Sequence, residues 1–121
     1  MERRTEYGTL AINDEVLAAI VQSAVLEMPG VADVGTFGLG EGLTELIKKD
    51  PGTRGVTFQD TDQGLVVEIA VIVDYGERIP ILGRRIVNRI SQVLSDAVSI
   101  RPAKVVVEVQ GIRSGTPESS R

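Results

Sequence analysis

Hydrophobic residues recur at helical spacing in two long segments of the chain. Between Asp14 and Met28, and again between Pro80 and Val98, apolar side chains gather on one side of a helical projection. Asn13 offers a side-chain cap to the first segment, and Pro80 suits the first turn of the second. The pattern therefore predicts two amphipathic helices over these segments, each with one face directed at a core.

Five shorter segments, rich in Val, Ile and Thr, have the alternation typical of β-strands. The longest follows an Asp- and Gly-containing stretch, Asp60–Gly64, that predicts a hairpin turn. The elements follow one another as β-α-β-β-β-α-β. This order predicts an α+β fold, a two-layer sandwich in which an about five-stranded mixed sheet carries two helices on one face. The predicted strands are Tyr7–Ile12, Val31–Phe37, Val56–Gln59, Leu65–Val73 and Lys104–Gln110.

A chain of 121 residues has the length of one domain. We expect residues 7–112 to form that domain, residues 1–6 to be a flexible N-terminus and residues 113–121 to be a disordered tail. Glycine and charged residues are dense in residues 38–55, which predicts a mobile loop with one short helix at 43–49.

The composition removes several classes of chemistry. The sequence contains no cysteine and no histidine, so thiolate nucleophiles, imidazole bases and the usual ligands of zinc, copper and haem are missing. A formal net charge of −4, with only two Tyr and two Phe, argues against a nucleic-acid binder that stacks bases. This composition also leads us to expect no cofactor or metal. Because the sequence shows no signal peptide and no membrane-spanning run, we expect a cytoplasmic protein.

Two glycine-containing stretches have both a functional and a structural interpretation. Residues 35–42, GTFGLGEG, suggest a phosphate-binding loop, but Leu43 stands where the dinucleotide pattern needs glycine, and the P-loop ending is missing. Asp60–Gly64 begins like a calcium loop, but the late acidic ligand would fall on Val71, inside a strand. A flexible loop and a hairpin turn are the better interpretations.

The second face of the long strand is the strongest candidate for a functional surface. Its middle is apolar and its ends are charged, and this face lies open if both helices cover the first. An exposed aliphatic patch with a polar rim is typical of a protein interface. A half-exposed sheet without a partner explains the pattern equally well. The candidate interface residues are Val66, Glu68, Ala70, Ile72, Val106 and Glu108.

Charged residues form two weaker candidates. Arg84, Arg85 and Arg89 make a basic stripe on the polar side of the second helix, which predicts either an anion contact or, more simply, a solvated face. Asp74 and Glu77 could serve acid–base catalysis only inside an enclosing pocket, and the sequence indicates none. The stretch VDYGERIP, which contains them, is better interpreted as a strand-to-helix connection.

Four stretches, in this order and spacing, resemble the alkaline shock protein family of Gram-positive bacteria, also called envelope stress response proteins. They are GTLAINDEVLAAIVQSAVLEMPGVADV, RGVTF, VEIAVIVDYGERIP and KVVVEVQGI, and together they extend over residues 7–112. MPGV, DYGERIP and VQGI in series carry most of the specificity. The chain departs from the family at residues 99–103, SIRPA, where members usually have a glycine-containing turn.

The resemblance implies a small cytoplasmic protein with no established catalytic activity and no recognised catalytic or cofactor residues. Some relatives self-associate and are held near the membrane by a separate membrane-anchored protein, and others are linked to general or alkaline stress. We therefore expect a non-enzymatic envelope stress response protein that acts as a scaffold or interaction module, either as a homo-oligomer or docked on a membrane-anchored partner. The alternative is a nucleic-acid-associated domain that uses the Arg-rich face of the second helix.

Overall fold

The computed structural model describes residues 2–35 and 55–114. The predicted loop at 38–55 lies outside the described residues except for Gly55, and so do the short helix expected at 43–49 and the tail beyond Ser114.

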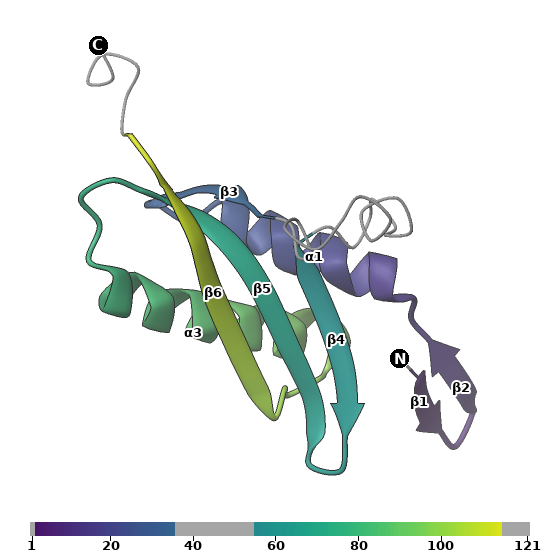
Figure 1. Cartoon of the computed structure of the whole chain (residues 1–121). Coiled ribbons are helices and arrows are strands. Elements are labelled where there is room, and N and C mark those ends of the chain that lie inside the picture. Colours follow the sequence, from purple (N-terminus) through teal and green to yellow (C-terminus); the bar gives the residue numbers. More distant parts are fainter. Residues whose placement is uncertain (1, 36–54, 115–121) are drawn as a thin grey trace, which may run out of the picture.

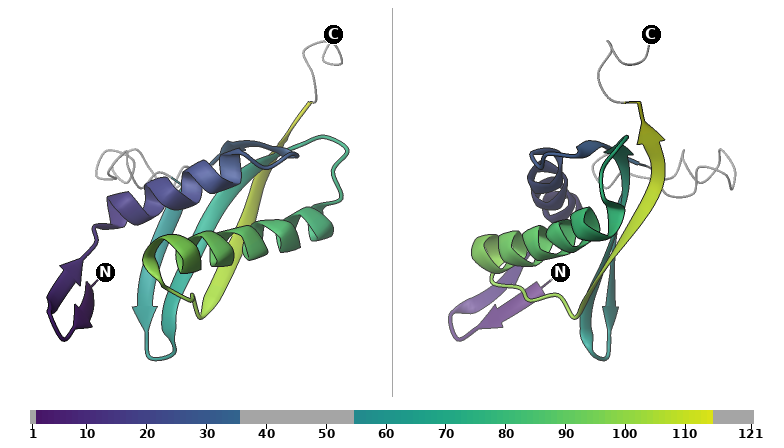
Figure 2. Two further views of the ribbon diagram at one scale, coloured as in Figure 1. Left: turned by 180° about the vertical axis from the view of Figure 1, so that it is seen from behind. Right: turned by 90° about the vertical axis from the view of Figure 1, so that its left-hand side faces the viewer.

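The described chain forms two layers, a four-stranded sheet and two helices that cover the same face of it (Figures 1 and 2). This arrangement confirms the predicted α+β class and the predicted order of the elements. The elements are β1 (Glu2–Thr5), β2 (Gly8–Ala11), α1 (Asp14–Leu26), β3 (Val31–Val34), β4 (Val56–Thr61), β5 (Gly64–Asp74), α3 (Ile79–Val98) and β6 (Lys104–Arg113).

Strand β5 is the centre of the sheet. Along one edge it pairs with β6 in parallel, from Val66 to Asp74. Its other edge is shared, since β4 pairs antiparallel with the first half of β5 and β3 with the second half. The sheet is therefore mixed, as predicted, and every other strand in it bonds to β5.

Strands β3 and β4 lie end to end along that shared edge and meet at Ala70. Gly35 N–H donates to the carbonyl of Ala70 at 2.7 Å, and Ala70 N–H donates to the carbonyl of Gly55 at 2.8 Å. The chain thus leaves the edge of the sheet after Gly35 and rejoins it at Gly55, opposite the same residue. Gly55 has a φ of +75°, and a Cβ there would collide with Val34 and with the Gly35 carbonyl, so only glycine fits.

The first predicted strand forms, but it does not join the main sheet. β2 pairs instead with β1, a strand that the sequence pattern did not predict, in a separate two-stranded hairpin beyond the start of α1 (Figure 1). Tyr7 at its turn is 92% exposed and Leu10 is 53% exposed. With Leu10 as its one large aliphatic residue, β2 has little apolar surface to bury against a core, and both edges of β5 are already occupied.

The core is aliphatic and lies between the sheet and the helices. One face of β5 supplies a continuous row of buried β-branched residues, which meets the apolar faces of both helices. Leu17, Ile69, Ile86 and Ile90 are among the largest side chains with almost no exposed surface. The fold is held by close packing of these residues rather than by buried polar contacts, and among the described residues no polar or charged side chain is classed as buried.

The end of α3 is set by Ser99, which takes a left-handed φ of 59°. Ser99 N–H donates to the Ser95 carbonyl and Ile100 N–H to the Leu94 carbonyl, both at 3.1 Å, and the first of these bonds closes the helix as in an αL motif. Ile100 is buried and anchors the turn. Glycine is favoured at such a left-handed position, and this chain has a serine there instead.

Replacing Ser99 by glycine should raise the free energy of unfolding by about 1 kcal/mol, because a left-handed residue with a Cβ is strained. The matched control is Ser95→Gly, four residues earlier in the same helix, which should lower it by about 0.5 kcal/mol. Urea denaturation followed by circular dichroism measures both values. Changes of the same sign in the two variants would contradict the assigned helix end.

Replacing Gly55 by alanine should lower the free energy of unfolding by about 3 kcal/mol or more, since backbone strain adds to a collision with the edge strand. Gly76→Ala is the control, because Gly76 has a φ of +95° but no atom within 4 Å of the added Cβ. It should cost only about 1–2 kcal/mol. Equal losses in the two variants, measured by the same urea denaturation, would show that β3 and β4 do not meet closely at Ala70.

Candidate interaction surface

The side of the sheet that faces away from α1 and α3, here called the outer face, brings the six predicted interface residues together. Residues paired in a parallel ladder point to the same side, so the register decides which side chains share this face. The outer face of β5 alternates with its buried row, and β6 adds residues beside it. The six are Val66, Glu68, Ala70 and Ile72 on β5, with Val106 and Glu108 on β6.

The apolar part of the outer face is narrower than the sequence predicted. Ala70 is fully buried, so it is not available for contact. The reason is local, since Ala70 lies against Gly35, and a Cβ on Gly35 would be 3.3 Å from the Cβ of Ala70 and would collide with Gln110. Val66, Ile72 and Val106 are half-buried and form the remaining apolar surface.

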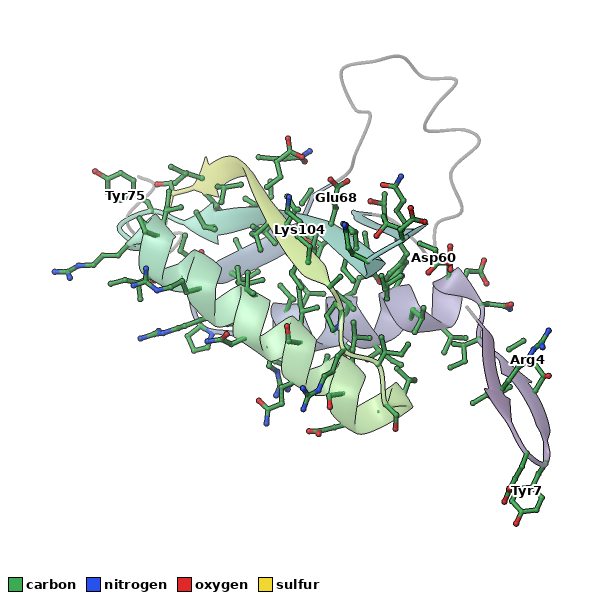
Figure 3. All side chains as sticks on the ribbon, turned by 90° about the horizontal axis from the view of Figure 1, so that it is seen from below. Arg4, Tyr7, Asp60, Glu68, Tyr75 and Lys104 are labelled. Carbon is green, nitrogen blue, oxygen red and sulfur yellow. The ribbon has the colours of Figure 1, made fainter. Side chains whose placement is uncertain are left out.

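Polar side chains border these three residues. Thr57 Oγ1 donates to Glu68 Oε1 at 3.2 Å, and Gln110 Nε2 lies 3.5 Å from Glu108 Oε1. Figure 3 shows Glu68 and Lys104 near one another on the sheet, away from the two helices. The rim is therefore charged and solvated, as is usual around an apolar contact patch.

An ion pair lies at the far end of the outer face. Arg113 on β6 and Asp33 on β3 approach to 3.8 Å, and both side chains are about half exposed. Because both strands pair with β5 near Ile72, this ion pair lies beside that residue. Gly111 is also adjacent, since a Cβ there would lie 3.4 Å from Ile72 Cδ1. Ile72 is thus a half-exposed aliphatic side chain that lies between Asp33 on β3 and Gly111 on β6.

The Arg-rich stripe lies on the helical layer, away from the outer face. Arg84 and Arg85 are exposed, whereas Arg89 is partly buried and its Nη2 lies 3.4 Å from Glu27 Oε1. This ion pair connects α3 with the end of α1, beside an open groove between the two helices that Ile20 and others line. One of the three predicted anion contacts is therefore engaged within the fold, although exposed pairs of this kind contribute little to stability.

VDYGERIP is a structural joint, in agreement with its interpretation as a connection. Asp74 N–H donates to the Gly30 carbonyl at 2.9 Å, and Tyr75 N–H donates to the Arg113 carbonyl at 2.8 Å. The end of β5 is thereby bonded to the start of β3 and to the end of β6. Glu77 packs close to Gly30.

Three sequence stretches that carry the family resemblance, MPGV, DYGERIP and VQGI, therefore meet at one end of the sheet. Sequence reasoning did not find this meeting. The sequence held one signal of this meeting, because in each stretch a glycine stands at or near the beginning or the end of an apolar strand.

The fold and its outer face define a class of small α+β domain in which both described helices cover the same side of the sheet. The chain belongs to the family of alkaline shock protein 23, described as having a cell envelope-related function, and the family model matches residues 2–114. The resemblance stated from the sequence motifs is thereby confirmed.

Three uncharacterised proteins are similar over most of their length. YloU of Bacillus subtilis is 25% identical over 97% of this chain and 98% of its own. Spy1614 of Streptococcus pyogenes is 26% identical over 90% of this chain and 91% of its own. YqhY of Bacillus subtilis is 27% identical over 93% of this chain and 82% of its own.

Two further findings concern residues 2–35 and 55–114. Neither helix there combines the length and the hydrophobicity needed to cross a bilayer. In the same part of the chain, no group of three or more acidic side chains is placed to bind a metal ion together.

The Asp60–Gly64 stretch is the turn of the β4–β5 hairpin, where Thr61 Oγ1 donates to the Gly64 carbonyl at 2.7 Å.

Proposed function

We propose that the protein is a non-enzymatic interaction module in envelope stress, and that its outer face contacts a second copy of the chain or a membrane-anchored partner. The observation that supports this proposal is that, among the described elements, helices cover one face of the sheet and leave the other without a helix. Both helices pack on the same face, and Val66, Ile72 and Val106 are half-exposed on the other, within a charged rim. The family's cell envelope-related function agrees with such a role.

The physical basis is the burial of aliphatic surface. Removing apolar area from water contributes about 25 cal/mol per Å², so covering three half-exposed aliphatic side chains favours association. The rim of Glu68, Glu108 and Lys104 would add little affinity, but it would select the partner and the orientation of the contact. In this proposal the protein works in the cytoplasm and reaches the membrane through its partner.

Catalysis by the acidic pair at the strand-to-helix joint has no support in the geometry. Asp74 and Glu77 lie on a turn whose backbone is bonded to neighbouring strands, and Glu77 is exposed. Acid–base chemistry requires a positioned substrate within hydrogen-bond reach of both groups, and the depression beside this turn is lined by Glu77 and Arg78 but not by Asp74.

The positions of the three arginines add no support for the nucleic-acid alternative. Of its three arginines, Arg89 is paired with Glu27, which leaves Arg84 and Arg85 exposed on a chain with a net charge of −4. Phosphate recognition usually depends on a larger basic surface than two neighbouring side chains.

Replacing Ile72 by aspartate tests the proposal. A charge in the middle of a dry contact must be desolvated, so self-association should weaken by about tenfold or more. Sedimentation velocity over a range of protein concentrations measures the effect, and circular dichroism checks that the helices are intact. Val16→Asp is the matched control, because Val16 is 49% exposed on α1, in the other layer.

An Ile72→Asp variant that associates as strongly as the wild type and as Val16→Asp would show that copies of the chain do not associate through the outer face.

A further inference from the structure

Strand β6 forms one edge of the sheet, and among the described residues no strand pairs with its free side (Figure 1). It is ten residues long and rich in valine. Proteins usually protect such an edge with proline, with a bulge or with a cover, because unpaired backbone groups attract another strand. The irregularity in β6 comes only after Val109, so the stretch from Lys104 to Val109 is regular, and no described strand covers its free side.

The backbone hydrogen bonds fix which residues of β6 offer their N–H and C=O groups to the free side. Ala70 N–H donates to the Gly55 carbonyl at 2.8 Å, so every second residue of β5 from Ala70 bonds to β4, and the residues between them, such as Val67, bond to β6. Because Val67 lies opposite Val105 in the parallel ladder, it bonds to the residues on either side of Val105, so Lys104, Val106 and Glu108 face β5. The backbone groups of Val105 and Val107 therefore point away from the sheet.

We propose that β6 pairs antiparallel with β6 of a second copy, around a two-fold axis at Val106. This inference rests on the self-association in the proposed function and specifies which strands of the two copies pair and in which register. Val106 then lies opposite itself, and Lys104 lies opposite Glu108 of the second copy on both sides of the axis. Val105 lies opposite Val107 of the second copy on both sides of the axis, and these two pairs use the free backbone groups and exchange about four hydrogen bonds.

The charges select this register from the others that the free backbone groups allow. A shift by one step, which is two residues, places Lys104 opposite Val106 or Gln110, without charge pairing. A shift by two steps places Glu108 opposite Glu108, or Lys104 opposite Lys104, and like charges directly opposite one another are destabilising. Only the register centred on Val106 gives two opposite-charge pairs, and a sequence that complements itself in this way fits a second copy of the same chain.

The same pairing covers apolar surface on both sides of the strand. On the outer face, Val106 would gain a valine of the second copy as its neighbour. On the core side, Val105 and Val107 pack against the core yet are only half-buried, and in this register each lies opposite the other's equivalent. The two sheets would become one continuous sheet, with both outer faces on the same side and all helices on the other.

Charge reversal tests the register. Lys104→Glu or Glu108→Lys, each alone, creates two like-charge pairs across the axis, so the dissociation constant of the dimer should rise about tenfold or more. An equimolar mixture of the two variants should associate as the wild type does, because every facing pair is then opposite in charge. Sedimentation velocity measures these associations, and Arg84→Glu on α3 controls for the change in net charge.

A cysteine on the proposed axis gives a second, independent measurement. The chain has no cysteine, so Val106→Cys introduces a single thiol. Val106 and its equivalent would form a non-hydrogen-bonded antiparallel pair, whose Cα atoms are about 4.5 Å apart, within the range of a disulfide. Val106→Cys should therefore form a covalent dimer under oxidising conditions, whereas Val66→Cys, one strand away from the edge, should not.

The outcomes separate this inference from the proposed function. If Ile72→Asp weakens association but the mixture of charge variants gives no recovery and Val106→Cys gives no covalent dimer, the β6 pairing is wrong and the outer-face contact stands. If Ile72→Asp has no effect while recovery and covalent dimers are seen, the β6 pairing stands and the outer-face contact is wrong. A wild-type chain that remains monomeric at all concentrations would overturn the β6 pairing.

Discussion

The structure depends on the packing of one face of β5 against both helices. β5 is the one strand, among those described, that pairs along both edges, and β3, β4 and β6 are all bonded to it. Its buried row, with Ile69 and Val71 at the centre, meets α1 and α3 together. Both helices lie on the same side of the sheet, so the single aliphatic layer between them and the sheet holds the described fold together.

The same constraint explains why the other side of the molecule is open. Because both helices are needed to cover the buried row, the described elements leave the outer face without a helix. The sheet consequently has a half-exposed aliphatic patch around Ile72 and Val106, and at β6 an edge that no strand of residues 2–35 and 55–114 pairs with. A family with a cell envelope-related function and no reactive constellation in the described fold is consistent with a protein that acts through such surfaces.

Local periodicity predicted the parts of the fold that depend on neighbouring residues. Both helices lie within two residues of the expected ends, the β4–β5 hairpin has the expected turn, and the alternation along β5 assigned its two faces correctly. The shared edge of β3 and β4, the separate hairpin that contains Leu10 and the burial of Ala70 were not predictable. Each depends on which distant segments meet. The sequence does not show, for example, that Gly35 will lie against Ala70 on another strand.

Amide hydrogen exchange, followed by NMR at a low and a high protein concentration, tests most directly the claim that a second copy completes the sheet. The free N–H groups of Val105 and Val107 should exchange quickly in dilute solution and slowly in concentrated solution. Those of Lys104, Val106 and Glu108, which are bonded to β5, should be protected at both concentrations. Rapid exchange at Val105 and Val107 under conditions in which the protein has associated would contradict the account.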